Sequence, residues 1–212
     1  MLANNLIIVM FNLPWEWSTD YTNQTAYELG KKNFVICYML EEMHSLKELI
    51  LKRKFPRLIQ KKSDSLYIYR PLHFLPFKRL IFISNINIII NVLIITMWVL
   101  LLKRLRNLNK LYLWVFDPAY YDIYHLFNKK FVLLYDCVDY FVGSRIGQER
   151  IIKEKEDKLL RESDYVFTIS HTLKKIHSKV RKDIYVVPQG FRLKSFKNAN
   201  YKTNEHIRHP KS

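Results

Sequence analysis

LIIVMF, at residues 6–11, and FVICYM, at residues 34–39, are the two stretches that decide the fold class. Each is an unbroken apolar run, as expected of a strand that is buried on both faces of a parallel sheet. Between them, Thr19 or Asp20 is suited to cap a helix that runs to about residue 32. A strand, a helix and a second strand in this order predict a parallel βαβ unit.

Further apolar runs continue this alternation along the chain. They predict five more strands, at residues 66–69, 111–116, 130–135, 165–169 and 184–187. Helical or charged stretches separate them, at residues 42–63, 78–107, 148–162 and 170–180. We therefore predict an α/β fold, a Rossmann-like parallel sheet of about seven strands with helices on both faces. Residues 1–196 are expected to form this domain, and residues 197–212 a polar, disordered tail.

The composition supports a folded domain and narrows the range of partners. Hydrophobic residues make up 49% of the 212 positions, which is enough for a sizeable core. The net charge of +16 favours anionic partners. Because no nucleic-acid-binding motif is readable, we expect an anionic membrane surface or a lipid-phosphate acceptor rather than nucleic acid.

Cysteine and histidine usage predicts no metal site and a reducing location. Cys37 and Cys137 lie in apolar, strand-like runs, which is typical of buried free thiols, and no metal-ligand spacing is found. The first apolar run is too short for a secretory signal and has no basic start. We expect a cytoplasmic protein, peripheral on the inner face of the cell membrane.

Residues 80–102 form an uncharged, apolar segment that is long enough to cross a membrane. Polar side chains inside it, such as Asn87 and Asn91, argue against a crossing, as does its place between two strands of one sheet. We predict a buried crossover helix. A membrane-docking helix with basic flanks is the second interpretation, and a true span is the third.

Candidate binding residues follow the strands, because working groups of parallel sheets gather at the carboxyl ends of the strands. Asp136 and Asp139 follow the 130–135 strand, either facing a cleft or capping a turn. Ser170 is placed to cap a helix whose free amides can bind an anion. Trp15 offers an exposed ring to a sugar or an isoprenoid chain, or else covers the following helix as a hydrophobic lid.

Several segments, in this order, resemble the N-terminal domain of family-4-type glycosyltransferases. They are YDCVDYF (135–141), IIKEKEDKLLRESD (151–164), YVFTISHTL (165–173) and IYVVPQGF (184–191). The opening stretch at residues 7–29 and WVFDP (114–118) resemble the subgroup that builds teichuronic-acid and exopolysaccharide-type polymers. The resemblance runs from about residue 6 to residue 196. It departs from the family at Gln189, where the family carries Asn before the glycine.

The resemblance implies a GT-B architecture, in which two Rossmann-like domains enclose the active site. The N-terminal domain binds the acceptor, and the C-terminal domain binds the nucleotide sugar without a bound metal. Because the sequence stops where a linker to the second domain is expected, we expect either a truncated gene product or a separate chain that supplies the donor domain. The nucleotide sugar is then a co-substrate of the full enzyme, and no cofactor is expected on this chain.

The predicted function is therefore the acceptor-binding half of a hexosyltransferase-like enzyme, inactive alone. The reaction moves a sugar from a nucleotide sugar to a lipid-linked or polysaccharide acceptor. The alternative is a non-catalytic module, derived from a glycosyltransferase, that docks on a membrane or a partner. The expected acceptor-binding residues are Trp15, Ser18, Asp117, Asp136, Asp139 and Ser170. The expected domain-interface residues are Gln189, Gly190 and Phe191.

Overall fold

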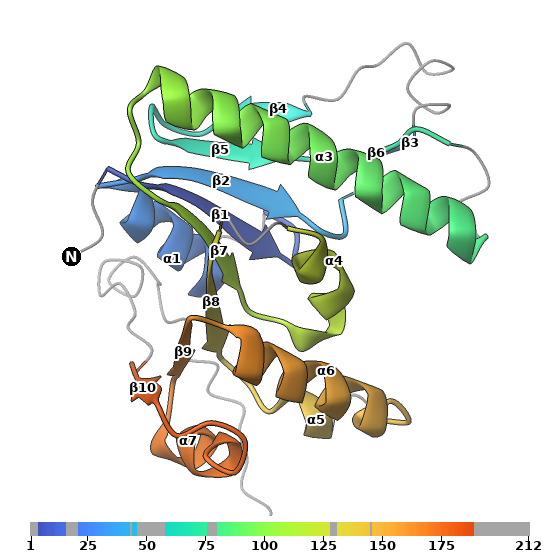
Figure 1. Ribbon diagram of the computed structural model, residues 1–212, viewed down its shortest axis with the longest axis vertical. Coiled ribbons are helices and arrows are strands. Elements are labelled where there is room, and N and C mark those ends of the chain that lie inside the picture. The colour runs from blue at the N-terminus through green and yellow to red at the C-terminus, as the bar shows by residue number, and fades with distance from the viewer. Residues whose placement is uncertain are drawn as a thin grey trace, which may run out of the picture.

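The chain folds around one large sheet. The computed structural model describes residues 4–15, 21–42, 44–45, 58–75, 80–127, 131–144 and 146–188. Its main sheet has eight strands in the order β10-β9-β8-β7-β1-β2-β5-β4 (Figure 1). Neighbouring strands are parallel throughout, except for the antiparallel pair β4 and β5. The prediction of a Rossmann-like α/β fold is confirmed.

All seven predicted strands are present, and three short strands are added. The strands are β1 (Leu6–Phe11), β2 (Phe34–Met39), β3 (His44–Ser45), β4 (Ile59–Lys61), β5 (Leu66–Tyr69), β6 (Leu72–His73), β7 (Leu111–Val115), β8 (Val132–Cys137), β9 (Tyr165–Thr168) and β10 (Ile184–Val186). β3 and β6 pair as a separate, parallel two-stranded sheet. In the stretch at residues 42–63, which was expected to be charged and partly helical, the structure places β3 and the edge strand β4, which pairs with β5; residues 46–57 lie outside the described residues.

Helices cover both faces of the sheet. They are α1 (Tyr21–Gly30), α3 (Ile81–Leu105), the 3-10 turn η1 (Pro118–Tyr120), α4 (Tyr121–Leu126), α5 (Phe141–Ser144), α6 (Glu149–Glu162) and α7 (His171–His177). α1 packs on one face, whereas α3, α4, α6 and α7 contribute to the core on the other (Figure 1). Strand residues alternate between these faces: Ile7 and Val9 join the α1 core, and Ile8 and Met10 the opposite one.

α3 is the predicted crossover helix, but only one of its faces is buried. Val92, Ile95 and Val99 pack against the sheet and are at most 4% exposed. The outer face carries exposed apolar side chains. By length and composition the stretch Phe82–Leu105 could cross a membrane, since its most apolar window has a mean hydropathy of 2.2 and is only 28% buried. The prediction of a buried crossover helix therefore holds for the inner face and is wrong for the outer face.

Two asparagines on the inner face of α3, Asn87 and Asn91, have hydrogen-bond partners in the neighbouring chain segment. The Asn91 amide accepts a hydrogen bond from Leu72 N (2.9 Å) and donates one to Leu72 O (2.7 Å). Asn87 makes the same pair of contacts with the backbone of Leu75. Tyr69 adds a hydroxyl hydrogen bond to Asn91 at 3.1 Å. Because a buried backbone group without a partner is costly, these amides fix β6 and the residues after it against α3.

Candidate functional site

A cavity of about 590 Å³ lies on the α1 side of the sheet, near the carboxyl ends of β7, β8 and β9. Its lining comes from α1, from these strands and from the residues after β10: Tyr21, Gln24, Thr25, Glu28, Leu29, Trp114, Asp136, Phe167, Val187 and Pro188. A larger cavity, of about 690 Å³, opens instead beside Leu133 and Asp164, at the amino ends of β8 and β9. Ligands of open α/β sheets bind at the carboxyl ends, so the first cavity is the candidate site.

Asp136 is the carboxylate of this cavity. It is the fifth of six residues in β8, and strand alternation directs its side chain to the α1 face. Its Oδ2 accepts hydrogen bonds from the Tyr21 hydroxyl (3.0 Å) and from Trp114 Nε1 (3.2 Å). These contacts join α1, β7 and β8 around one carboxylate.

Burial changes the acidity of both partners in this pair. Asp136 is only 3% exposed, and desolvation raises its pKa from 3.8 to about 6, although the two hydrogen bonds lower it. Burial and the neighbouring Asp136 charge raise the pKa of Tyr21 well above its usual value. At neutral pH the carboxylate is therefore charged and the phenol is neutral, which provides an acceptor beside a donor.

Aromatic rings form the floor of the cavity. Trp114 stacks on Phe167 with ring centroids 5.8 Å apart and an interplanar angle of 14°. The ring centroids of Phe167 and Tyr185 lie 5.9 Å apart, and Tyr185 is 54% exposed. A row of rings beside a carboxylate matches the two needs of a sugar, whose C–H face packs on aromatic surface while its hydroxyls form hydrogen bonds.

Asp117 lies at the carboxyl end of β7 but belongs to a different group of side chains. It is 1% exposed and caps η1, with Oδ1 accepting from Ala119 N at 2.9 Å. Its Oδ2 accepts from the Asn12 amide at 3.0 Å, which links the ends of β1 and β7. Asp136 instead accepts hydrogen bonds from Tyr21 and Trp114.

Two other predicted residues, Asp139 and Ser170, follow β8 and β9 at the same edge. Asp139 is exposed and accepts from the backbone of Tyr140, as the turn interpretation predicted. Ser170 caps α7, where its Oγ accepts from Leu173 N at 3.2 Å. Ser18 and the interface candidates Gln189, Gly190 and Phe191 lie outside the described residues.

Trp15 corrects one expectation. Its side chain is 5% exposed and packs against Phe11 (5.5 Å) and Tyr27 (5.6 Å). The ring therefore belongs to the core beneath α1, and the expectation of an exposed stacking ring in the loop is wrong.

Sequence reasoning missed a partly buried ion pair at the same edge. Glu42, after β2, pairs with Arg70, after β5, and their side chains are 20% and 11% exposed. Glu42 also accepts from the backbone of Trp15 at 3.0 Å, and Arg70 donates to Gln60 at 3.0 Å. Arg70 directly follows a predicted strand and Glu42 lies three residues after another, so their position near the edge was the only signal in the sequence.

Comparisons with known proteins identify the fold. No protein-family model and no curated protein sequence matches the chain. Among solved structures, sucrose-phosphate synthase from Thermosynechococcus elongatus, a GT-B glycosyltransferase, matches 90% of this chain with a TM-score of 0.56 and 12% identity. The chain has a glycosyltransferase-like, Rossmann-type α/β fold.

The match also gives the extent of the likeness. The chain spans about half, 49%, of that sucrose-phosphate synthase structure. A second structure of the same enzyme is matched over 93% of its length, with 11% identity and a TM-score of 0.49. At such identity the likeness concerns the fold alone.

Proposed function

We propose that this chain is the N-terminal, acceptor-side half of a GT-B glycosyltransferase of the family-4 type, within the subgroup that makes teichuronic-acid or exopolysaccharide-like polymers. The observation that carries the proposal is the fold likeness, which covers 90% of the chain and about half of a two-substrate sugar-transfer enzyme. The other half, which binds the nucleotide sugar, is supplied by another domain or chain. We expect no sugar transfer by these 212 residues alone, because donor and acceptor must be bound in one geometry.

The acceptor binds in the cavity beside Asp136. A sugar unit packs on the rings of Trp114 and Phe167, and one hydroxyl donates a hydrogen bond to the Asp136 carboxylate. Tyr21 keeps that carboxylate in place from α1. The role of Asp136 is therefore to bind and orient the acceptor.

The proposal is tested by acceptor binding, which does not require the donor half. Titration of the full chain with a lipid-linked or polysaccharide-derived oligosaccharide should change the tryptophan fluorescence, because Trp114 lines the cavity. Asp136→Asn should weaken this binding by about tenfold, the loss of one charge-assisted hydrogen bond. Asp64→Asn is the matched control, since the Asp64 side chain is 97% exposed.

Sugar transfer is then measured with nucleotide sugars and a donor-domain chain. Transfer only in the presence of that chain supports the split enzyme. Folded protein that neither binds an acceptor nor supports transfer with any donor domain contradicts the proposal and favours the non-catalytic docking module.

We also propose that the outer face of α3 docks on the anionic, cytoplasmic face of a membrane. This outer face is formed by apolar residues that are 36% to 75% exposed: Phe82, Ile89, Leu93, Ile94, Met97, Leu100, Leu101 and Leu105. Lys103 and Arg104 lie in the last turn of α3, and the whole chain has a net charge of +16. Apolar surface with adjacent basic charge is the pattern of interfacial helices.

Vesicle flotation tests this surface. Leu93→Gln and Met97→Gln should each weaken binding to anionic vesicles by about tenfold, because each removes a large apolar side chain from the membrane contact. Ile151→Gln on α6 is the matched control, because Ile151 is 56% exposed and Leu93 is 58% exposed. Equal loss in the control, or equal binding by all variants, contradicts docking through α3.

A further inference from the structure

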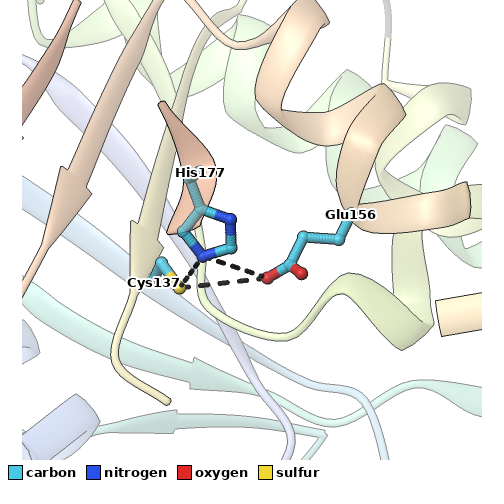
Figure 2. Close-up of side chains that lie close together, drawn as sticks. All are labelled: Cys137, Glu156 and His177. Atoms are coloured by element: carbon cyan, nitrogen blue, oxygen red, sulfur yellow. Dashed lines mark hydrogen bonds and ion pairs between the residues drawn. The ribbon is translucent and has the colours of Figure 1, made fainter. Parts of the chain in front are cut away.

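Three ligand-type side chains meet inside the core on the face opposite the cavity. Cys137 ends β8, Glu156 lies in the middle of α6, and His177 ends α7 (Figure 2). Their exposed fractions are 0%, 3% and 3%. Figure 2 shows the thiol, the carboxylate and the imidazole pointing toward one another from these three elements.

The separations between the ligand atoms lie at or slightly beyond the edge lengths of a coordination tetrahedron. His177 Nε2 lies 3.3 Å from Cys137 Sγ and 3.7 Å from Glu156 Oε1, and Sγ lies 3.9 Å from Oε1. A separation of 3.7 Å between nitrogen and oxygen is too long for a hydrogen bond. With zinc–sulfur bonds of about 2.3 Å and zinc–nitrogen or zinc–oxygen bonds of about 2.0–2.2 Å, tetrahedral edges are roughly 3.3–3.6 Å.

The arrangement differs from that of a nucleophilic cysteine. In a Cys–His–acid triad, the thiol and the acid contact opposite nitrogens of the imidazole. Here Cys137 and Glu156 both approach Nε2 of His177. Cys137 is also fully buried, so a substrate has no access to its sulfur.

We propose that Cys137, Glu156 and His177 bind a thiophilic divalent cation, zinc in the first place. A thiolate and a carboxylate together supply the two negative charges that balance such an ion, and binding of the ion releases the proton of the thiol. Tyr135 donates a hydrogen bond to Glu156 Oε1 at 2.8 Å and so orients the carboxylate from outside the ligand set. A water molecule or the second oxygen of Glu156 is left for the fourth position.

The bound ion would connect β8, α6 and α7. Because Cys137 directly follows Asp136, this connection also fixes the strand segment that carries the cavity carboxylate. The site differs from anything expected of the fold likeness, and its test does not depend on sugar transfer or on acceptor binding.

Cobalt(II) substitution is the direct test. The full 212-residue chain, with any affinity tag removed, is stripped with chelator and titrated with Co²⁺ and then with Zn²⁺. Wild type should bind one equivalent, show a thiolate-to-cobalt charge-transfer band, and lose that band when zinc displaces cobalt. A hundredfold excess of zinc over its Kd should raise Tm by about 5–10 °C.

Matched cysteine variants separate this site from adventitious binding. Cys137→Ala should lose the band and the Tm shift, whereas Cys37→Ala should retain both, because Cys37 is an equally buried free thiol in β2. Glu156→Gln, which retains an oxygen for the Tyr135 hydroxyl, should bind zinc more weakly than wild type. Folded wild-type protein without the band, or a band that persists in Cys137→Ala, overturns the proposal.

Discussion

Asp136→Asn should make the protein more stable at neutral pH, although it removes a side chain of the candidate site. The carboxyl is 3% exposed, and burial raises its pKa from 3.8 to about 6 despite hydrogen bonds from Tyr21 and Trp114. Asparagine retains an oxygen for both donors and carries no charge. The substitution thus removes the cost of burying a carboxylate and leaves the neighbouring contacts in place.

The magnitude follows from the linkage between pKa and stability. The pKa of Asp136 is higher in the folded state than in the unfolded state. The stabilisation that protonated Asp136 gives the folded state is therefore fully present below pH 3.8 and is lost as the pH rises through about 6. At 1.36 kcal/mol per pKa unit the full difference is about 3 kcal/mol. The free energy of unfolding of the variant should exceed that of wild type by about 1 kcal/mol at pH 4.5 and by about 3 kcal/mol at pH 7.5.

Urea unfolding between pH 4.5 and 8, followed by circular dichroism in buffer with EDTA, measures this difference. The chelator keeps metal binding at Cys137 out of the comparison. Asp64→Asn, at an exposed position paired with Lys61, should show no such rise with pH. A variant that is less stable than wild type at pH 7.5, or a difference that does not change with pH, would refute the reasoning.

Two further predictions concern hydrogen bonds that fix α3 and α7. Asn91→Leu should lower the free energy of unfolding by about 3 kcal/mol or more, because it leaves both backbone groups of Leu72 without their side-chain partner in the core. Urea unfolding measures this loss, and a loss below about 1 kcal/mol would contradict the prediction. Ser170→Ala should lower the free energy of unfolding by about 1 kcal/mol, because it removes the cap of α7. Ser170→Asp retains a capping oxygen and should melt close to the wild-type temperature. Equal melting of the two Ser170 variants would argue against the cap.

The strands and the position of the candidate edge were predictable because their signals are local. Unbroken apolar runs can be buried on both faces only within a covered parallel sheet, and all seven such runs became strands. Asp117, Asp136, Asp139 and Ser170 do lie at or near strand carboxyl ends. Trp15 was misplaced because a loop aromatic gives no local sign of whether α1 will cover it.

Strand order and the direction of each side chain were decided by tertiary structure. The edge strand β4 lies in a charged stretch whose sequence suits a helix, and its pairing with β5 fixes it as a strand. Alternation along β8 implies that Asp136 and Cys137 face opposite sides, but it does not say which helices they meet.

By itself, then, the sequence determined the α/β class, the seven parallel strands and the edge that carries the candidate site. Packing decided that Asp136 meets Tyr21 and Trp114 in a cavity, and that Cys137 meets partners 19 and 40 residues away. The physical reason is range: burial and periodicity act between neighbours in the chain, whereas a site forms from side chains that only the folded sheet brings together.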